Sequence, residues 1–499
     1  MLAETAAEAA KRFGPAPAFV ADEGLTLSYA QFDAMADEAA VGLAELGVGE
    51  GDVVGLLLPS VPEHFIVYVA AAKLGAVTAA VNPRLVSAER DAVLRVANPR
   101  VVITTEQLAP AERTGSIASV LVVPANDPAA VLEGLRRPGT SPAPLAPDAD
   151  RPVAIVFTSG TTGTPKGAVF CGRQIGFITQ CDVGAAWGGG GHSMAGSALA
   201  HLGPTTKLAG NLKKGGTQHL SQQAWKAADA LRKVAELGIA ALSGVPTQIA
   251  LMLRDPSFDS TDLSSVRAVV MGGGPATPAL VREARARIGA PLAVRYSCTE
   301  AGIGCGTSFG DPDEDAEVSV GRPRPGVRLS ILDEAGAPVE PGAIGEVCLG
   351  SPAVMEGYWR NSGANADAFS EDGSVRTGDL GWVDERGRLH LAGRSRERYV
   401  RGGYNVYPME VEGVLADHPG VAAVAVVSRN DPMMGEIGVA VVVPQPDAPT
   451  PELAQLRDFA AEHLARYKLP EDMVVLSALP LTAGEKVDRR ALERLIATS

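Results

Sequence analysis

The residues with the clearest chemical potential form a run of hydroxyl, glycine and lysine side chains directly after an apolar segment. Residues 158–167 read Thr-Ser-Gly-Thr-Thr-Gly-Thr-Pro-Lys-Gly and follow the apolar run Val153–Phe157. Glycines let the backbone turn tightly and bring N–H groups toward an anion. Hydroxyls donate hydrogen bonds to phosphate oxygens, and the lysine adds a positive charge. We call residues 158–167 the phosphate loop, with a plain surface loop as the alternative. The expected ligands of the phosphates are Thr158, Ser159, Gly160, Thr161, Thr162, Gly163 and Lys166.

This loop differs from the G-x-x-x-x-G-K-[ST] type, because Lys166 is followed by glycine and that spacing is absent from the chain. Six further motifs follow it in order. They are Gly272-Gly273-Gly274-Pro275-Ala276, Tyr296-Ser297-Cys298-Thr299-Glu300, Arg376-Thr377-Gly378-Asp379, Gly393-Arg394-Ser395-Arg396-Glu397, Gly402-Gly403-Tyr404-Asn405-Val406-Tyr407-Pro408 and Leu481-Thr482-Ala483-Gly484-Glu485-Lys486-Val487. Each alone describes an ordinary turn or a solvated charge run, so their order carries the argument.

Together these motifs resemble the signature of the adenylate-forming superfamily, in particular its acyl-CoA synthetase branch, over essentially the whole chain. The resemblance implies ATP, Mg²⁺ and coenzyme A as cofactors or co-substrates. It implies that Gly273, Gly274 and Pro275 lie beside adenine. Tyr296 would stack on the base, with Ser297 next to it in the same nucleotide-binding motif, and Thr299 would contact the α-phosphate. Glu300 would hold Mg²⁺, which prefers one or two carboxylates plus phosphate oxygens and water. Asp379 and Arg394 would bind the ribose.

The same resemblance gives the last hundred residues a role in both half-reactions. Arg396 and Glu397 stand where the family has its hinge, and Gly402 and Gly403 would line the pantetheine tunnel. Lys486 would stabilise the charge that develops during adenylation. Three departures stand out: Ser297 replaces a usual glycine, Arg396 and Glu397 replace lysine and aspartate, and Glu485 precedes the lysine.

Residues 188–220 correspond to the expected acyl pocket. His201 would flank the path of the carboxylate, although a packed core histidine explains it equally well. Lys207 could pair with an anionic group of the substrate or point to solvent. Gly188–Gly191 is expected to be a loop.

The elements that must position these residues alternate between apolar strands and helices. Predicted strands are Val53–Leu58, Ala76–Val81, Val101–Thr104, Ser119–Val123, Val153–Phe157, Ala268–Met271 and Leu292–Tyr296. A helix is predicted over Val61–Leu74, and others near Pro408–Leu415 and Pro451–Arg466. Such alternation indicates parallel sheets covered by helices. After Val320, short strands with Gly and Asp turns favour an antiparallel or barrel-like section.

The predicted fold is therefore α/β. A large N-terminal domain, 1–394, would combine parallel helix-covered sheets with the barrel-like section, and a small mobile α+β domain, 395–499, would follow. The chain has 499 residues, of which 20% are charged, and a net charge of −14. No basic stripe points to nucleic acid. The five cysteines lack C-x-x-C spacing, and no segment is typical of a signal peptide or membrane span. A cytoplasmic location is expected, and the oligomeric state stays open, a homodimer included.

The expected activity is that of an ATP-dependent acid–CoA ligase acting on a small-molecule carboxylic acid. Fatty, aryl, dicarboxylic and steroid-derived acids are all compatible with the sequence. Alternatives keep the adenylation but change the acceptor to a carrier protein, an amine or nitrite in a diazotase-type reaction. A catalytically silent nucleotide-binding relative is the remaining alternative, and the presence of Glu300, Asp379, Arg394 and Lys486 argues against it.

Overall fold

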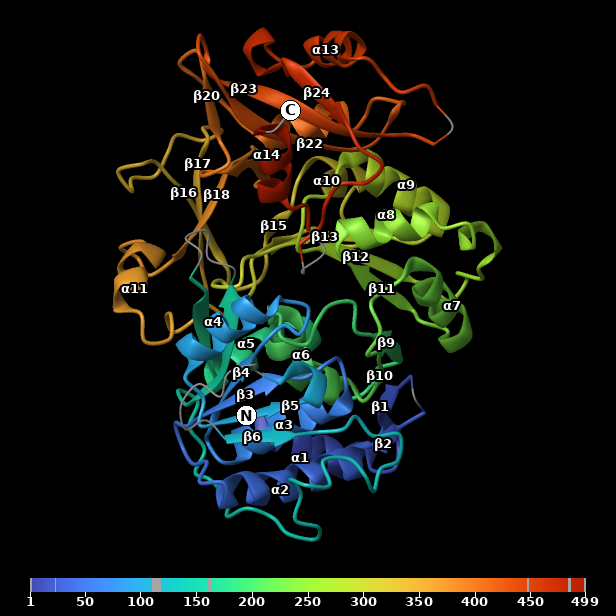
Figure 1. Cartoon of the computed structure of the whole chain (residues 1–499), viewed down its shortest axis with the longest axis vertical. Coiled ribbons are helices and arrows are strands. Elements are labelled where there is room, and N and C mark those ends of the chain that lie inside the picture. The colour runs from blue at the N-terminus through green and yellow to red at the C-terminus, as the bar shows by residue number, and fades with distance from the viewer. Residues whose placement is uncertain are drawn as a thin grey trace.

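The computed structural model describes residues 2–22, 24–109, 118–158, 164–446, 448–482 and 486–497. The chain rises from the N-terminal sheets at the bottom of Figure 1 to a separate C-terminal unit at the top. Among the described residues, no helix combines the length and apolar character needed to cross a membrane.

A six-stranded sheet forms the base that carries the phosphate loop. Its order is β6-β5-β3-β4-β7-β8, and every pairing is parallel except that of β7 with β8. The strands are β3 (Val53–Leu57), β4 (Val77–Ala80), β5 (Val101–Thr104), β6 (Ala118–Leu121), β7 (Pro152–Thr158) and β8 (Lys166–Cys171). Every residue of β3 and β4 is buried, which is typical of strands covered on both faces.

Helices pack around this sheet and a smaller one beside it. They are α1 (Leu2–Phe13), α2 (Tyr29–Glu45), α3 (Pro62–Lys73), α4 (Ser87–Ala97), α5 (Gly172–Val183) and α6 (Leu202–Lys214). Ser28 and Gln31 cap the start of α2 reciprocally, and Pro62 opens α3. The smaller sheet has the order β2-β1-β10-β9 and consists of β1 (Pro17–Ala21), β2 (Thr26–Ser28), β9 (His192–Met194) and β10 (Thr217–Leu220).

A third sheet positions the motifs at residues 272–276 and 296–300. Its order is β11-β12-β13-β14-β15, with parallel pairing from β11 to β13. The strands are β11 (Ala241–Gly244), β12 (Ala268–Gly272), β13 (Leu292–Tyr296), β14 (Cys305–Gly306) and β15 (Arg322–Pro323). Its helices are α7 (Ala227–Leu237), α8 (Pro246–Arg254), α9 (Pro278–Ile288) and α10 (Asp313–Val318), which lie on the right of Figure 1.

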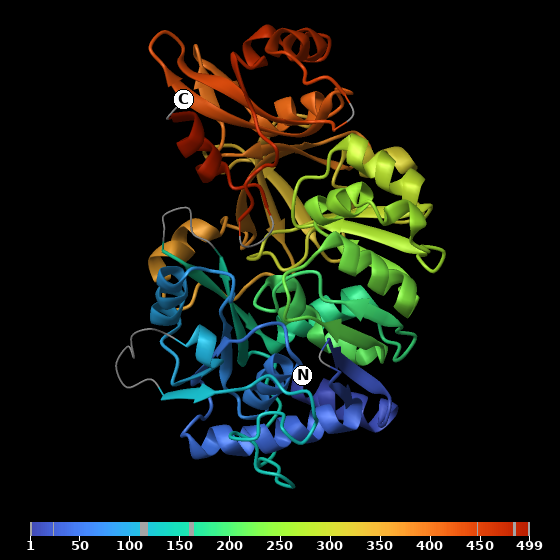
Figure 2. The same ribbon diagram turned by 45° about the vertical axis from the view of Figure 1, so that its right-hand side comes forward.

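An antiparallel sheet links this part to the C-terminal unit. It runs β16 (Arg328–Leu332), β17 (Gly345–Gly350), β18 (Val375–Val383) and β19 (Leu389–Arg394), with α11 (Ser362–Ala368) between the second and third strands. When the view is turned by 45°, these strands stand between the lower sheets and the C-terminal unit (Figure 2). The antiparallel section expected after Val320 is therefore present.

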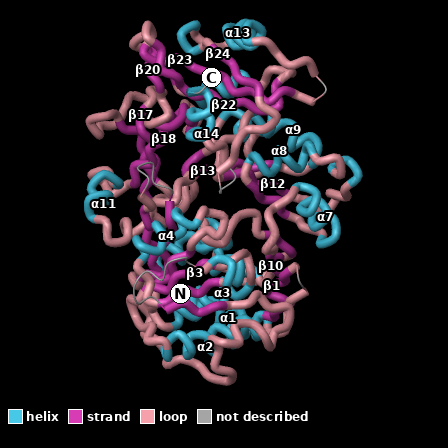
Figure 3. The backbone as a smooth tube through the Cα atoms, viewed as in Figure 1, coloured by secondary structure: helices cyan, strands magenta, loops and turns pink. Residues whose placement is uncertain are grey.

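The C-terminal unit has its own core around a sheet of order β21-β20-β23-β22, with β24 paired to β23. The strands are β20 (Tyr399–Arg401), β21 (Tyr404–Val406), β22 (Val421–Asp431), β23 (Gly435–Pro444) and β24 (Asp472–Val475), and the helices are α12 (Pro408–Leu415), α13 (Leu453–Ala461) and α14 (Arg489–Ala497). Figure 3 shows helices and strands mixed throughout the molecule, which confirms the predicted α/β class with a large first and a small second domain.

Most predicted elements coincide with observed ones, and the differences lie at their ends. The helix expected over 451–466 ends at Ala461, and a separate short 3₁₀ turn covers Arg466–Lys468. The strand expected at 119–123 ends at Leu121. Gly188–Gly191 is a loop, as expected.

Candidate active site

Asp379 lies at the centre of a cluster that joins β13, β18 and β19. The hydroxyl of Tyr296 donates to Oδ2 of Asp379 at 2.7 Å, and Nε of Arg394 lies 3.1 Å from Oδ1. Asp379 and Arg394 face each other in the pairing of β18 with β19, so strand register sets this contact. Tyr296 and Asp379 are buried, whereas the side chain of Arg394 is 53% exposed. Both oxygens of the Asp379 carboxylate thus have protein donors, and Arg394 is the more exposed of the two donors.

Lys486 of the C-terminal unit lies close enough to this cluster for its charge to act on it. Burial raises the pKa of Asp379, while the charges of Arg394 and Lys486 and the Tyr296 hydrogen bond oppose that rise. The surrounding protein lowers the pKa of Lys486, Arg394 lowers it further, and Asp379 acts in the opposite sense. The side chain of Lys486 is nevertheless exposed. Its ammonium group therefore lies near other protein groups and is also accessible to water.

The base of the phosphate loop is a pair of antiparallel strands. Thr158 at the end of β7 faces Lys166 at the start of β8, and the Thr158 hydroxyl donates to the carbonyl of Lys166 at 3.4 Å. Gly167 is needed for this pairing, because a Cβ there would lie 2.5 Å from a methyl group of Ile155. The remaining predicted ligands, Ser159, Gly160, Thr161, Thr162 and Gly163, lie outside the described residues.

Glu300 lies with Thr299 in the turn after β13 and has a partner that the sequence did not indicate. The hydroxyl of Tyr358 donates to Oε1 of Glu300 at 2.7 Å. The ammonium of Lys166 lies 5.1 Å from the centre of the same tyrosine ring. The metal-side carboxylate and the lysine of the phosphate loop therefore meet at one aromatic side chain.

The half-buried thiol of Cys298 lies within reach of the charges of both Glu300 and Asp379. Burial raises the pKa of Cys298, and the charge of Glu300 raises it further, while Asp379 and Arg394 act more weakly in opposite senses. The neighbouring Ser297 has no positive φ, so the residue in place of the usual glycine fits the backbone without strain. Its hydroxyl donates to the carbonyl of Cys298 at 3.1 Å.

The predicted adenine-side loop leaves the end of β12. Gly273 has φ +81° in this bend, and Gly274 and Pro275 lead toward α9. Beta carbons built on Gly273 and Gly274 would each lie 3.5 Å from the Val245–Pro246 segment at the start of α8. The loop thus lies against neighbouring protein on one side and follows a parallel strand, where ligands of open α/β sheets bind.

His201 immediately precedes α6 and lies near the end of β4. Its Nε2 is 3.4 Å from Nδ2 of Asn82. Burial lowers the pKa of His201, and the positive charges of Lys486 and Arg84 lower it further, so the ring is neutral at pH 7. Lys207, which lies on α6, pairs with Asp182 at 3.2 Å, and its side chain is half exposed. That ion pair argues against Lys207 as a free partner for an anionic substrate.

The chain passes into the C-terminal unit between Ser395, which is bonded to the first domain, and Glu397, which is paired within the C-terminal unit. The backbone N–H of Ser395 donates to Gly378 of β18 at 3.0 Å, whereas Glu397 lies 3.0 Å from Arg489 of α14. Further on, Gly402 and Gly403 form the two-residue turn of the β20–β21 hairpin with φ of +54° and +87°. Positive φ at both positions is what a tight hairpin of this kind requires. The turn is exposed.

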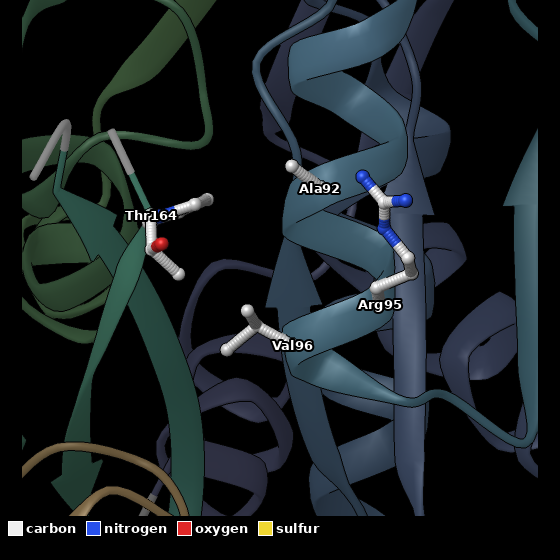
Figure 4. Close-up of a pocket in the computed structure, with 5 residues that line it drawn as sticks. Ala92, Arg95, Val96 and Thr164 are labelled. Atoms are coloured by element: carbon white, nitrogen blue, oxygen red, sulfur yellow. The ribbon is translucent and has the colours of Figure 1, made fainter. Parts of the chain in front are cut away.

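Two cavities lie near these elements. One of about 420 Å³ is lined by Ala92, Arg95, Val96, Thr164 and Pro165, and Figure 4 shows Thr164 across from Ala92 and Val96 of α4. It lies beside the end of the phosphate loop, away from Asp379. The other, of about 350 Å³, lies between α1, α5 and α6 and includes Trp187 and Lys213.

The structure therefore gathers six of the predicted residues into two groups. Asp379, Tyr296, Arg394 and Lys486 form one, and Glu300 and Lys166 form the other with Tyr358. The predicted Gly402–Gly403 turn belongs to neither in the described contacts. Sequence reasoning missed Tyr358, Asn82 and Arg84. A lone tyrosine 58 residues from Glu300 gives no sequence signal of that contact.

Comparison with known proteins identifies the family to which the chain belongs. A family model described as AMP-binding enzyme matches residues 6–359, and one described as AMP-binding enzyme C-terminal domain matches residues 410–486. The chain is 32% identical over 480 residues to the fatty acid–[acyl-carrier-protein] ligase ScoC of Streptomyces coeruleorubidus, covering 94% of this chain and 92% of that one. It is also 32% identical over 490 residues to the indoleacetate–CoA ligase of Aromatoleum aromaticum, covering 94% and 93%. The solved structure of the amide bond synthetase McbA from Marinactinospora thermotolerans superposes with a TM-score of 0.86 at 26% identity, covering 99% and 100%.

Proposed function

Because the chain belongs to the family of AMP-binding enzymes, we propose that it is an ATP-dependent ligase that adenylates a carboxylic acid and transfers the acyl group to coenzyme A. The observation that carries the proposal is the position of Lys486. The ammonium group comes from the second domain and acts on Asp379, Arg394 and His201 of the first. A charge brought across a domain boundary into a nucleotide site suits a reaction at phosphorus.

In the first step, a carboxylate oxygen of the acid attacks the α-phosphorus of ATP, the bond to the β-phosphate oxygen breaks, and pyrophosphate leaves. Such a transfer asks the protein for positioning and for neutralisation of charge. We assign the ribose to Asp379 and Arg394, adenine to Tyr296 and the Gly273–Pro275 loop, the phosphates to the phosphate loop and Thr299, and the developing charge to Lys486. Neutral His201, held beside Asn82, would border the carboxylate.

Magnesium fits the donor set that the structure offers. In the described residues, no cluster of three or more His, Cys, Asp or Glu side chains could enclose a metal. Glu300 offers a single carboxylate, which matches the habit of Mg²⁺ to take one or two carboxylates and complete its shell with phosphate oxygens and water. Bound there, Mg²⁺ would neutralise phosphate charge, while Glu300 orients the triphosphate through it.

In the second step, the thiolate of coenzyme A attacks the acyl carbon, the bond to the AMP oxygen breaks, and AMP leaves. We propose that residues 395–499 turn as a unit about Arg396, the residue between the anchors at Ser395 and Glu397. This motion would withdraw Lys486 and bring in the exposed Gly402–Gly403 turn. Next to that turn, Tyr404 and Tyr467 stack with ring centres 4.6 Å apart, and Tyr404 is 58% exposed. This aromatic face can take the adenine of coenzyme A.

A carrier-protein thiol is the second candidate acceptor, because the relative that accepts one is as similar to this chain as the CoA-dependent relative. The test is pyrophosphate release from ATP and Mg²⁺ with a panel of fatty, aryl and dicarboxylic acids. Each acid is assayed alone, with coenzyme A, with a phosphopantetheinylated carrier protein and with an amine. Acid-dependent release with AMP turnover only in the coenzyme A arm supports the proposal.

Turnover in the carrier-protein or amine arm alone would keep the adenylation and replace the acceptor. A chain that binds ATP but releases no pyrophosphate with any acid would contradict ligase activity on these substrate classes. Glu300→Gln serves as the matched negative control, because it removes the metal carboxylate while keeping the side-chain shape.

A further inference from the structure

Tyr358 contacts two catalytic parts that come from different regions of the chain. Its hydroxyl donates to Oε1 of Glu300 at 2.7 Å, and its ring lies 5.1 Å from the ammonium of Lys166. A lysine within about 6 Å of an aromatic centre is attracted by the ring face. One side chain therefore touches the proposed metal ligand with its polar end and the cation of the phosphate loop with its face.

The backbone of Tyr358 is fixed to the strand that begins at Lys166. Tyr358 forms a β-bridge with Ala168 of β8, and Trp359 donates to the carbonyl of Gly167 at 2.7 Å. The amide of Tyr358 donates to Oδ1 of Asn365 at 2.7 Å. The ring thus has a set position relative to the base of the phosphate loop.

The same segment also holds the backbone of Glu300. The amide of Met355 donates to the carbonyl of Glu300 at 2.8 Å, three residues before the tyrosine that binds its carboxylate. Oε1 is taken by Tyr358, and no described residue forms a hydrogen bond or ion pair with Oε2. The carboxylate is therefore oriented with one oxygen satisfied and one available.

We propose that Tyr358 is a positioning residue that fixes Glu300 with Oε2 as the metal ligand and keeps Lys166 beside the same phosphates. The inference rests on the proposed function and deepens it, because it names what orients the metal-binding carboxylate. Partners of metal ligands typically change metal affinity or activity about 10- to 100-fold when removed.

The first test is binding of Mn²⁺, used as a spectroscopic probe for Mg²⁺, to the full-length protein with a non-hydrolysable ATP analogue. Tyr358→Phe removes the hydroxyl and keeps the ring, so we expect Mn²⁺ affinity to fall about tenfold. The Mg²⁺ concentration for half-maximal pyrophosphate release should rise equally, while the rate at saturating Mg²⁺ stays within about threefold. Unchanged Mn²⁺ affinity would overturn the proposal.

A double-mutant cycle separates positioning from general destabilisation. If Tyr358 acts through Glu300, Tyr358→Phe should change Mn²⁺ affinity less than about twofold in a Glu300→Gln background. An equal loss in both backgrounds would refute the mechanism. Tyr29→Phe is the matched control, because it removes a buried tyrosine hydroxyl that donates to Gly216 at 2.6 Å outside the site. It should lower the melting temperature without altering Mn²⁺ affinity.

The metal titration needs neither an acid nor an acceptor. Ligase turnover can therefore be absent while Tyr358→Phe still weakens Mn²⁺ binding, which would leave this inference standing and remove the proposed function. Turnover in the wild type with unaltered Mn²⁺ binding in Tyr358→Phe would do the reverse.

Discussion

In the proposed mechanism, the first half-reaction depends most on Lys486, because this side chain brings a positive charge to Asp379, Arg394 and His201 from another domain. We expect Lys486→Ala to slow adenylation about 100-fold or more, as removal of a single charge-stabilising donor does elsewhere. Thioester formation from a preformed acyl-adenylate should stay near the wild-type rate. Single-turnover measurement of each half-reaction checks this, with exposed Lys214→Ala as the control. Equal loss in both steps would contradict the assignment.

His64 on α3 offers a residue-scale prediction about stability. It is buried, its Nδ1 has no partner, and burial lowers the pKa of His64 to about 3. The unfolded chain binds a proton near the ordinary histidine pKa of about 6.5, whereas the folded chain does not until about pH 3. The free energy of unfolding should therefore fall as pH drops below about 6.5, by up to about 1.4 kcal/mol per pH unit from this group.

His64→Leu removes that titration, so its stability should fall less steeply than the wild type between about pH 6.5 and about pH 5. Urea unfolding at several pH values measures the two slopes. Parallel wild-type and His64→Leu profiles would mean that His64 takes up its proton in the folded state.

Single residues also show where sequence reasoning stops. The T-G-D pattern singled out Asp379, and strand register then explains its contact with Arg394. Nothing local to Tyr358 distinguishes it from a packed aromatic residue, because its role depends on a partner that only the folded chain brings close. Lys207 looked unusual for an acyl pocket until Asp182, 25 residues earlier, proved to be its partner.

The β20–β21 hairpin is the element that should decide the acceptor. Its turn is set by Gly402 and Gly403, and Tyr404 beside it exposes an aromatic face that stacks on Tyr467. If adenine of coenzyme A lies there, Tyr404→Ala should raise the KM for coenzyme A about tenfold, since base stacking on an aromatic side chain contributes about 1–3 kcal/mol. The KM for pantetheine, which lacks the base, should hardly change.

Steady-state kinetics with both thiols makes that comparison, and Tyr404→Phe should behave like the wild type. Similar changes for both thiols would show that Tyr404 supports the tunnel or the turn rather than the base.

At the scale of elements, apolar runs predicted β3, β5 and β13 well, because strands buried on both faces are mostly apolar. Boundaries were less secure: the amphipathic pattern after Pro451 continues past Ala461, where the helix ends. The small sheet of β1, β2, β9 and β10 was not predicted, because it joins short segments nearly 200 residues apart.

For the whole molecule, the arrangement of the two domains is held by contacts between α8, α9 and the C-terminal unit. Nη2 of Arg254 donates to the carbonyl of Ala422 at 2.6 Å, and Nη2 of Arg282 lies 3.1 Å from Oδ1 of Asp417. Exposed pairs of this kind are individually weak, so their removal should shift the balance between arrangements without unfolding either domain.

We therefore expect Arg254→Ala/Arg282→Ala to slow adenylation about fivefold and to leave thioester formation from a preformed acyl-adenylate unaffected, in line with a modest population shift. Rapid-quench assays of the separate half-reactions test this. Arg287→Ala is a control from the same surface, because Arg287 pairs with Asp259 inside the first domain. Loss confined to thioester formation would show that these contacts belong to the other arrangement.

Motif order predicted two domains, but no sequence pattern revealed which surfaces meet.

The antiparallel base of the phosphate loop has a consequence for how the first product departs. Thr158 and Lys166 face each other on paired strands, so the phosphate loop connects two strands and does not lead directly into a helix. In sites where glycine-rich turns open a helix, its macrodipole keeps a permanent attraction for anions. In the proposed reaction, the countercharge would come from Lys166 and from an ion that arrives with the nucleotide. Pyrophosphate would then leave without the added retention of a helix macrodipole, which favours an activation step that runs in one direction.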